Sequence, residues 1–248
     1  HKPIPLTKKI NTYLKENNSK IGIGLYKEKR NVYQGDNYIS KFSNKSRRNI
    51  HVGIDIFAKE GTNIRAPLDG KVFILKDNAY EYDYGPTVIL EHNINSDKFY
   101  TIYGHLSKKC LKNLNVGKKI KKGEVIAEIG NYPINGNWPP HLHFQISLDM
   151  MGEKENFPGV SEDILLDLWS NISPDPNLIL GIPNSFFENN ENSKKILRER
   201  NSLISKSYSI FYKKPLQMLQ AKNQYFYDNM GKQYLDCVNN ISHVGHSH

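Results

Sequence analysis

The sequence predicts a mainly β protein: an antiparallel β-sandwich or hybrid barrel with short helices and an irregular C-terminal extension. Between about residues 50 and 148, short runs of β-branched and aromatic residues recur at strand-and-turn spacing, separated by Gly and Pro. The prediction depends on six such runs: HVGIDIF, GKVFIL, TVILEH, FYTIYGHL, EVIAEIG and HLHFQIS. Their length and spacing are typical of all-β sandwiches and barrels.

The chain divides into four predicted parts. They are a basic N-terminal extension or linker (1–45), a β domain (46–150), a Pro-rich linker with a short helix (151–195) and a final part (196–248). At 248 residues the chain is long enough for one large domain or two small ones.

Three smaller elements are predicted outside the β domain. Residues 1–45 contain one or two strands, and a helix is expected at 191–204. The stretch NQYFYDNMGKQYLDCV is typical of a hairpin, with Asn229, Met230 and Gly231 at its turn.

The positive charge is confined to the first fifty residues. They carry twelve Lys/Arg and three Asp/Glu, a balance that equals the net charge of +9 for the whole chain. A nucleic-acid or anionic-surface role is compatible with this arm. A solvated Lys/Asn-rich leader is the favoured interpretation, so no nucleic-acid partner is expected. No apolar run approaches the ~20 residues of a membrane span, so no membrane partner is expected either.

Cysteine is too sparse to define a site. Cys110 and Cys237 are far apart and support neither a disulfide framework nor a cysteine zinc cluster. A metal site in this chain must therefore use His and carboxylate ligands.

Three of the predicted strands carry histidines in an alternating pattern. Successive side chains on a strand point to opposite faces, so each segment is expected to place its apolar set in the core and its polar set on the other face. The polar sets are His51 and Asp55 in HVGIDIF; Thr101, Tyr103 and His105 in FYTIYGHL; and His141, His143 and Gln145 in HLHFQI.

A single histidine on such a strand is usually satisfied by an ordinary hydrogen bond. The combined set changes this interpretation, because four histidines and one aspartate gather on three strands of one small domain. They supply three metal ligands and two spare imidazoles, and a catalytic zinc needs about three N/O ligands and one open position.

The motifs H-x-G-x-D (51–55), YGHLS (103–107) and H-x-H (141–143) together resemble the lysostaphin/LytM-type zinc endopeptidases. GTNIRAPLDGKV and VGKKIKKGEVIAEIG are similar to that family as well, and the resemblance covers about residues 47–148. Each motif alone is weak, but the set stands in the family's order.

The resemblance implies a role for each residue. His51, Asp55 and His143 would bind one zinc ion per chain, and His141 and His105 would be the catalytic histidines beside it. The implied chemistry is hydrolysis of a peptide or amide bond by metal-activated water. Separate roles for His105 and His141 stay open. Gln145 stands where many relatives carry glutamate, outside the metal's ligands, and is not read as loss of activity.

Two further groups of histidines receive lower weight. His92 ends TVILEH and is expected to cap or solvate a strand end. The terminal HVGHSH looks like a metal-binding tract. However, residues 208–248 resemble the opening of class III aminotransferases, so the tract is interpreted as part of that domain.

The matched part lacks the cofactor lysine, so no transamination is expected from it. Pyridoxal phosphate would bind only in a full-length fusion.

The stretches SPDPNLILGIP and DYGPTVILEH are similar to fusions of such a peptidase with an aminotransferase, which can also carry a choline-kinase-like module upstream. The family's substrate is the peptide of peptidoglycan, which implies the bacterial envelope. The fusion context favours small-molecule metabolism in the cytoplasm, with other domains of the parent chain as partners. The alternative is a non-catalytic binding or scaffolding module, because APLDGKV and GKKIKKGEVIAEIG also resemble biotinyl/lipoyl-like hybrid domains.

Overall fold

The computed structural model describes most of the chain, in two compact units that we treat separately: His1–Gly181 and Ile182–His248. The described residues are 3–33, 36–40, 46–95, 97–183, 191–203, 218–222, 225–228 and 233–235.

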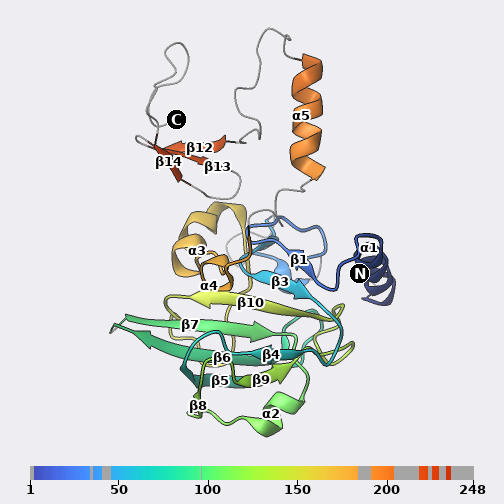
Figure 1. Cartoon of the computed structure of the whole chain (residues 1–248). Helices are drawn as coiled ribbons and strands as arrows, with labels where there is room; N and C mark the ends of the chain where they lie inside the picture. The colour runs from blue at the N-terminus through green and yellow to red at the C-terminus, as the bar shows by residue number, and fades with distance from the viewer. Residues whose placement is uncertain are drawn as a thin grey trace. The chain divides into compact units, whose positions relative to one another are not determined.

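The first unit is built on a seven-stranded sheet in which every neighbouring pair is antiparallel (Figure 1). In spatial order its strands are β1 (Gly22–Gly24), β3 (Ile54–Phe57), β10 (His141–Ser147), β7 (Asp97–Gly104), β6 (Gly85–Ile94), β5 (Gly70–Asn78) and β8 (Lys119–Ile120). Two small antiparallel sheets accompany it, β4 (Asn63–Arg65) with β9 (Val125–Glu128) and β2 (Ile50–His51) with β11 (Val160–Ser161). The predicted mainly β, antiparallel fold class is confirmed.

Both faces of the central strands are covered. On one face, the core side chains pack against the β4–β9 pair and the short helix α2 (Lys109–Asn113); they include Leu142, Phe144, Tyr103, Val88 and Leu90. On the other face, Ile89 and Ile102 pack against Met150, Phe157 and Trp169 from the chain after β10. Strand β10 is therefore buried at all seven positions. Strands covered on both sides exclude water from whatever polar groups they carry.

The predicted alternation in residues 99–106 is wrong. Tyr103 pairs with Phe144 in the register of β7 and β10 and lies in the same core, with ring centroids 5.4 Å apart. Ile102, which was expected on that core face, lies on the opposite one. The alternation cannot distinguish the two faces of a strand when apolar layers cover both.

The interpretation of His92 is also wrong. Its side chain is fully buried rather than solvated at a strand end. Nδ1 lies 2.7 Å from the Asp69 carbonyl oxygen and Nε2 lies 2.7 Å from Thr101 Oγ1. His92 is thus a satisfied core histidine outside the candidate site.

The N-terminal region contains one strand, which agrees with the one or two predicted for residues 1–45, and a helix that was not predicted. A helix, α1 (Pro3–Glu16), precedes the short strand β1 and the 3₁₀ turn η1 (Asp36–Tyr38). Leu6, Ile10 and Leu14 recur every four residues and form the half-buried stripe of this helix. The surrounding Lys and Asn residues obscured that period in the sequence.

The rest of the first unit consists of short helical segments: η2 (Asp163–Leu165), α3 (Leu166–Ile172) and α4 (Asn177–Leu180). In the second unit, α5 (Glu191–Leu203) confirms the helix predicted at 191–204. β12 (Met218–Lys222), β13 (Tyr225–Asp228) and β14 (Gln233–Leu235) form an antiparallel sheet, which includes the predicted hairpin. The turn at 229–231 and the tract at 243–248 lie outside the described residues.

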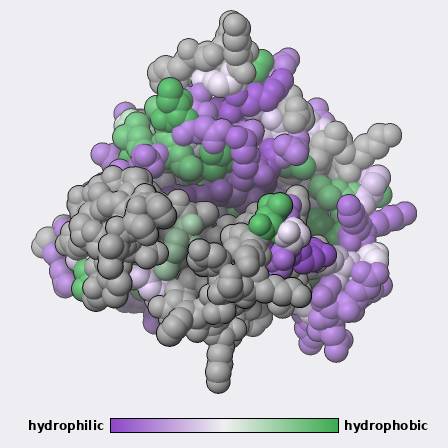
Figure 2. Space-filling view, turned by 90° about the horizontal axis from the view of Figure 1, so that it is seen from above, coloured by the Kyte–Doolittle hydropathy of each residue, from purple (hydrophilic) through white to green (hydrophobic). Residues whose placement is uncertain are grey.

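Hydrophilic and hydrophobic side chains are interspersed on the face seen from above (Figure 2). Within the described part of the chain, no helix combines the length and the apolar character needed to cross a membrane. The four predicted domain limits remain predictions.

Candidate metal centre

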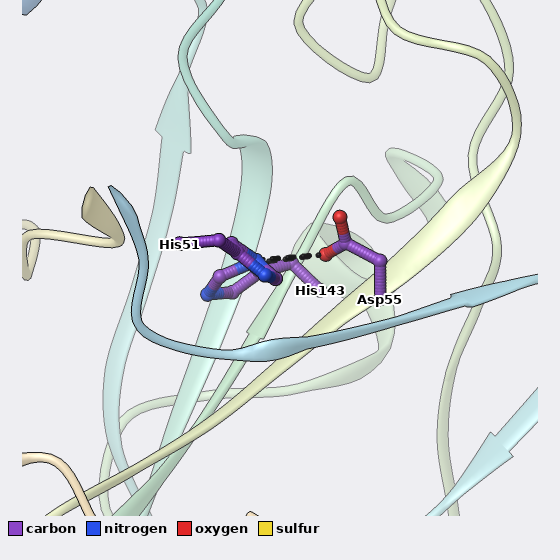
Figure 3. A group of neighbouring side chains, drawn as sticks. All are labelled: His51, Asp55 and His143. Atoms are coloured by element: carbon purple, nitrogen blue, oxygen red, sulfur yellow. Dashed lines mark hydrogen bonds and ion pairs between the residues drawn. The ribbon is translucent and has the colours of Figure 1, made fainter. Parts of the chain in front are cut away.

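The side chains of His51, Asp55 and His143 converge on one point (Figure 3). His51 ends β2, Asp55 lies on β3, and His143 lies on β10 directly opposite Asp55 in the register. His51 Nε2 lies 2.9 Å from His143 Nδ1, and each of these nitrogens lies 3.2 Å from Asp55 Oδ1. The structure therefore brings together the three residues predicted as metal ligands, and their role as ligands stays a prediction.

Hydrogen bonds fix which nitrogen of each ring carries the proton. A carbonyl oxygen only accepts, so His51 Nδ1, 3.1 Å from the Leu25 carbonyl, is the donor of its ring. Gln145 Nε2 donates to the Pro158 carbonyl at 3.1 Å, which turns Gln145 Oε1 towards His143 Nε2 at 3.0 Å. His143 Nε2 therefore donates, and the lone pairs of His51 Nε2 and His143 Nδ1 face each other.

Two lone pairs and a carboxylate oxygen at this spacing form a site for a cation. Zinc binds nitrogen and oxygen ligands at about 2.0–2.1 Å, which places tetrahedral ligands about 3.3 Å from one another. The observed separations of 2.9 to 3.2 Å are close to that value. The donor set and its spacing fit zinc.

The charge states of His51 and Asp55 at pH 7 also favour the binding of zinc. Burial lowers the pKa of His51 to about 4, so this imidazole is neutral at pH 7. Burial alone would raise the pKa of Asp55, but His51 and Arg30 outweigh it and hold that pKa well below its usual value. A neutral imidazole and an ionised carboxylate are the forms that bind metal.

The two predicted catalytic histidines lie beside the ligands. His141 Nδ1 donates to the Pro139 carbonyl at 2.6 Å, and His105 Nδ1 donates to the Asn135 carbonyl at 2.9 Å. Each ring is thus left with Nε2 as a proton acceptor, and His141 Nε2 lies 3.8 Å from Asp55 Oδ1. The two rings are 4.3 Å apart, and burial lowers the pKa of both. Both are neutral bases at pH 7.

His105 reaches this group by a route that the alternation did not predict. Strand β7 ends at Gly104, and His105 follows with φ 62°, in the left-handed region. This turn carries the side chain out of the strand's alternation and towards His141. Gly104 is required nearby, because a Cβ there would lie 2.4 Å from Cδ1 of Tyr84. The ring of Tyr84 in turn contacts His143, with centroids 5.0 Å apart.

Arg30 is a site residue that the sequence did not reveal. Its Nη1 lies 2.5 Å from Asp55 Oδ2 and its Nε lies 2.7 Å from Glu28 Oε2. The two oxygens of Asp55 are therefore divided, with Oδ2 on Arg30 and Oδ1 on the histidines. The interpretation of residues 1–45 as a solvated leader is wrong at this position, because only 14% of the Arg30 side chain is exposed. The sequence could not predict this burial, because Arg30 is one of twelve Lys and Arg residues in the first fifty positions.

A cavity of about 660 Å³ opens onto the histidines. Arg30, Tyr33, Trp138 and Phe157 line it together with the five predicted site residues, of which none is more than 6% exposed. Tyr33 and Trp138 meet edge to face at 6.0 Å, so the upstream segment contacts the loop before β10. The volume is in the range of small-molecule and short-peptide sites.

Comparison with known proteins shows what the central part of the chain is similar to. The model of Peptidase family M23 matches residues 49–156. An uncharacterized metalloprotease of Haemophilus influenzae is 37% identical over 100 residues, which are 40% of this chain and 19% of that protein. Glycyl-glycine endopeptidase ALE-1 of Staphylococcus capitis is 36% identical over 95 residues, 38% of this chain and 24% of that protein.

A different relative matches a shorter segment. The alanine–glyoxylate aminotransferase 2-like protein of Drosophila melanogaster is 42% identical over 53 residues, 21% of this chain and 11% of that protein. The matched segments thus cover a quarter or less of each of these three relatives. The match over residues 49–156 includes all five predicted site residues, so the candidate site lies within the part of the chain that is similar to Peptidase family M23.

Proposed function

We propose that this chain contains a zinc-dependent peptidase that hydrolyses a peptide or amide bond. His51 Nε2, Asp55 Oδ1 and His143 Nδ1 would hold the metal, and His141 and His105 would handle protons. The observation that carries the proposal is the convergence of two proton-free imidazole nitrogens and one carboxylate oxygen within 3.2 Å of one another.

The chain's own residues divide the remaining work. Zinc, when bound, lowers the pKa of a water ligand and polarises the scissile carbonyl. His141, a neutral base held by Pro139, takes a proton from the attacking water and delivers it to the leaving amine. His105, held in the same way by Asn135, hydrogen-bonds the water or the developing oxyanion. Both imidazoles are aimed before substrate binds, because their Nδ1 atoms are already occupied.

The proposed substrate is a short peptide or small amide that enters the cavity at the histidines. The name of one relative, a glycyl-glycine endopeptidase, favours glycine-containing peptides, and the family resemblance favours peptides of the cell wall. We further propose that residues 196–248 correspond to the start of an aminotransferase-like domain, which the short aminotransferase match supports.

Zinc content and hydrolysis test this function together. Elemental analysis of the purified chain should give about one zinc, lost in His51→Ala and His143→Ala and retained in His92→Ala. The last variant is the matched control, because His92 is an equally buried histidine with two hydrogen bonds and no link to the site. Absence of bound zinc at neutral pH would overturn the proposal.

Hydrolysis should be screened with glycine-containing peptides, purified peptidoglycan and small amides. Cleavage that disappears in His141→Gln while zinc remains supports catalysis. A zinc-bound protein that cleaves none of these substrates favours the alternative, a binding or scaffolding module.

A further inference from the structure

The amide of Gln145 determines the orientation of the ligand His143. Gln145 is completely buried beside His143 on β10. Its oxygen accepts from His143 Nε2 at 3.0 Å, and its nitrogen donates to the Pro158 carbonyl at 3.1 Å and to Ser173 Oγ at 2.9 Å. These three hydrogen bonds hold both the oxygen and the nitrogen of the Gln145 amide in place.

Both partners of the Gln145 nitrogen lie beyond residue 156, where the M23 match ends. Ser173 is the residue that caps the C-terminal end of α3, and its N–H donates to the Trp169 carbonyl at 2.7 Å. Its own carbonyl accepts from the Tyr26 hydroxyl at 2.6 Å. Trp169 anchors the helix in the core, edge-on to Phe157 with centroids 5.9 Å apart. The Ser173 hydroxyl is thus held in place by the core on this face of the sheet.

We propose that Ser173 is a positioning residue of the metal centre, which acts through Gln145 to keep Nδ1 of His143 free for the metal. The segment downstream of the M23 match would then contribute to metal binding through Ser173. This inference rests on the proposed function, because it assumes that His143 binds zinc.

Loss of the hydroxyl weakens the hold on the amide. In Ser173→Ala the Gln145 nitrogen keeps the Pro158 carbonyl, which still determines which end of the amide faces His143, but it loses the second bond that keeps the amide in place. A less restrained Gln145 oxygen accepts more weakly from His143 Nε2, so the ring is less firmly oriented. A larger share of His143 then carries its proton on Nδ1, and a protonated Nδ1 binds no metal. Outer partners of metal-bound histidines typically contribute about 10–100-fold to metal affinity.

The experiment compares zinc affinities, measured by competition with a chelator, in the full chain. Ser173→Ala should bind zinc about 10-fold or more weakly than the wild type. Ser161→Ala is the matched control, because Ser161 is also buried downstream of the match but its hydroxyl donates to the Glu162 carbonyl. Ser173→Thr, which keeps the hydroxyl, should recover most of the affinity.

A double-mutant cycle separates positioning from a general loss of stability. Gln145→Leu should weaken zinc binding on its own, and adding Ser173→Ala to it should cost nothing more, because both act through one amide. Nitrogen-15 NMR of the imidazoles should show the His143 proton on Nε2 in the wild type and a smaller share of it on that atom in Ser173→Ala.

If Ser173→Ala and Ser161→Ala bind zinc equally well, the role of Ser173 is wrong and the proposed function stands. Fully additive losses in the cycle would also overturn it. A wild-type chain that binds no zinc would instead overturn the proposed function itself.

Discussion

Gly53→Ala should disable the proposed metal centre without replacing any of its three proposed ligands. Gly53 lies between β2 and β3, and a Cβ built there would lie 2.5 Å from Cε1 and 2.7 Å from Nε2 of His143. The Phe144 carbonyl oxygen, at 2.9 Å, closes off the other side. An alanine methyl at this position therefore has to displace the His143 ring.

The size of that displacement follows from the contact distance. Ordinary carbon–carbon contacts lie at about 3.5 Å, so the ring must move by about 1 Å. Functional metal sites tolerate about 0.2 Å in their ligand distances. We expect Gly53→Ala to weaken zinc binding by more than the roughly 100-fold upper range for loss of an outer partner. Overpacking should also lower the free energy of unfolding by about 1–3 kcal/mol.

Chelator competition, with thermal unfolding in the presence and absence of zinc, measures both effects. Gly22→Ala is the matched control, because the atoms nearest its Cβ would be the flexible end of Leu14 at 3.2 Å and the Phe57 side chain at 3.5 Å, and none belongs to the site. This variant should bind zinc normally. If Gly53→Ala binds zinc as tightly as Gly22→Ala does, His143 is not the ligand that the geometry assigns.

Three further predictions concern protons and hydrogen bonds in the same region. His141→Gln should retain zinc in elemental analysis while hydrolysis falls by about 10²–10⁴-fold, and an unchanged rate would remove His141 from the mechanism. In the metal-free protein, urea unfolding should show stability falling as the pH drops from about 6.5 towards 4. In this range His51 binds a proton in the unfolded chain but stays neutral in the folded one, where burial lowers its pKa to about 4. This difference should lower the free energy of unfolding by about 3 kcal/mol. A stability independent of pH in this window would contradict the burial of a neutral His51. Gln145→Glu should lower the free energy of unfolding at pH 7 by about 1–3 kcal/mol, because a carboxylate cannot donate to the Pro158 carbonyl 3.1 Å away. Equal stability in urea would show that this bond contributes nothing.

The sequence predicted the parts of the site that depend on local spacing. On β10, a period of two places His141 and His143 on one face, and the register then sets His143 opposite Asp55. These contacts require only that the segments form neighbouring strands. The β fold class was also predictable from local sequence, because β-branched and aromatic residues mark most of the strands, and Gly and Pro mark the turns between them.

The remaining parts depend on long-range packing, which a single sequence does not contain. His105 reaches the site through a left-handed residue at the end of β7, and strand alternation assigns it no such turn. Arg30 and Ser173 come from segments outside the motifs, 25 residues before Asp55 and 28 residues after Gln145. Neither residue differs in type from the many arginines and serines that lie on surfaces.

Anomalous diffraction at the zinc absorption edge tests the central claim most directly. We expect one zinc per chain, bonded to His51 Nε2, Asp55 Oδ1 and His143 Nδ1, with the Nε2 atoms of His141 and His105 facing its open position. A zinc bonded elsewhere, or no zinc in a crystal grown at neutral pH with all three residues intact, would contradict the assignment of this metal centre.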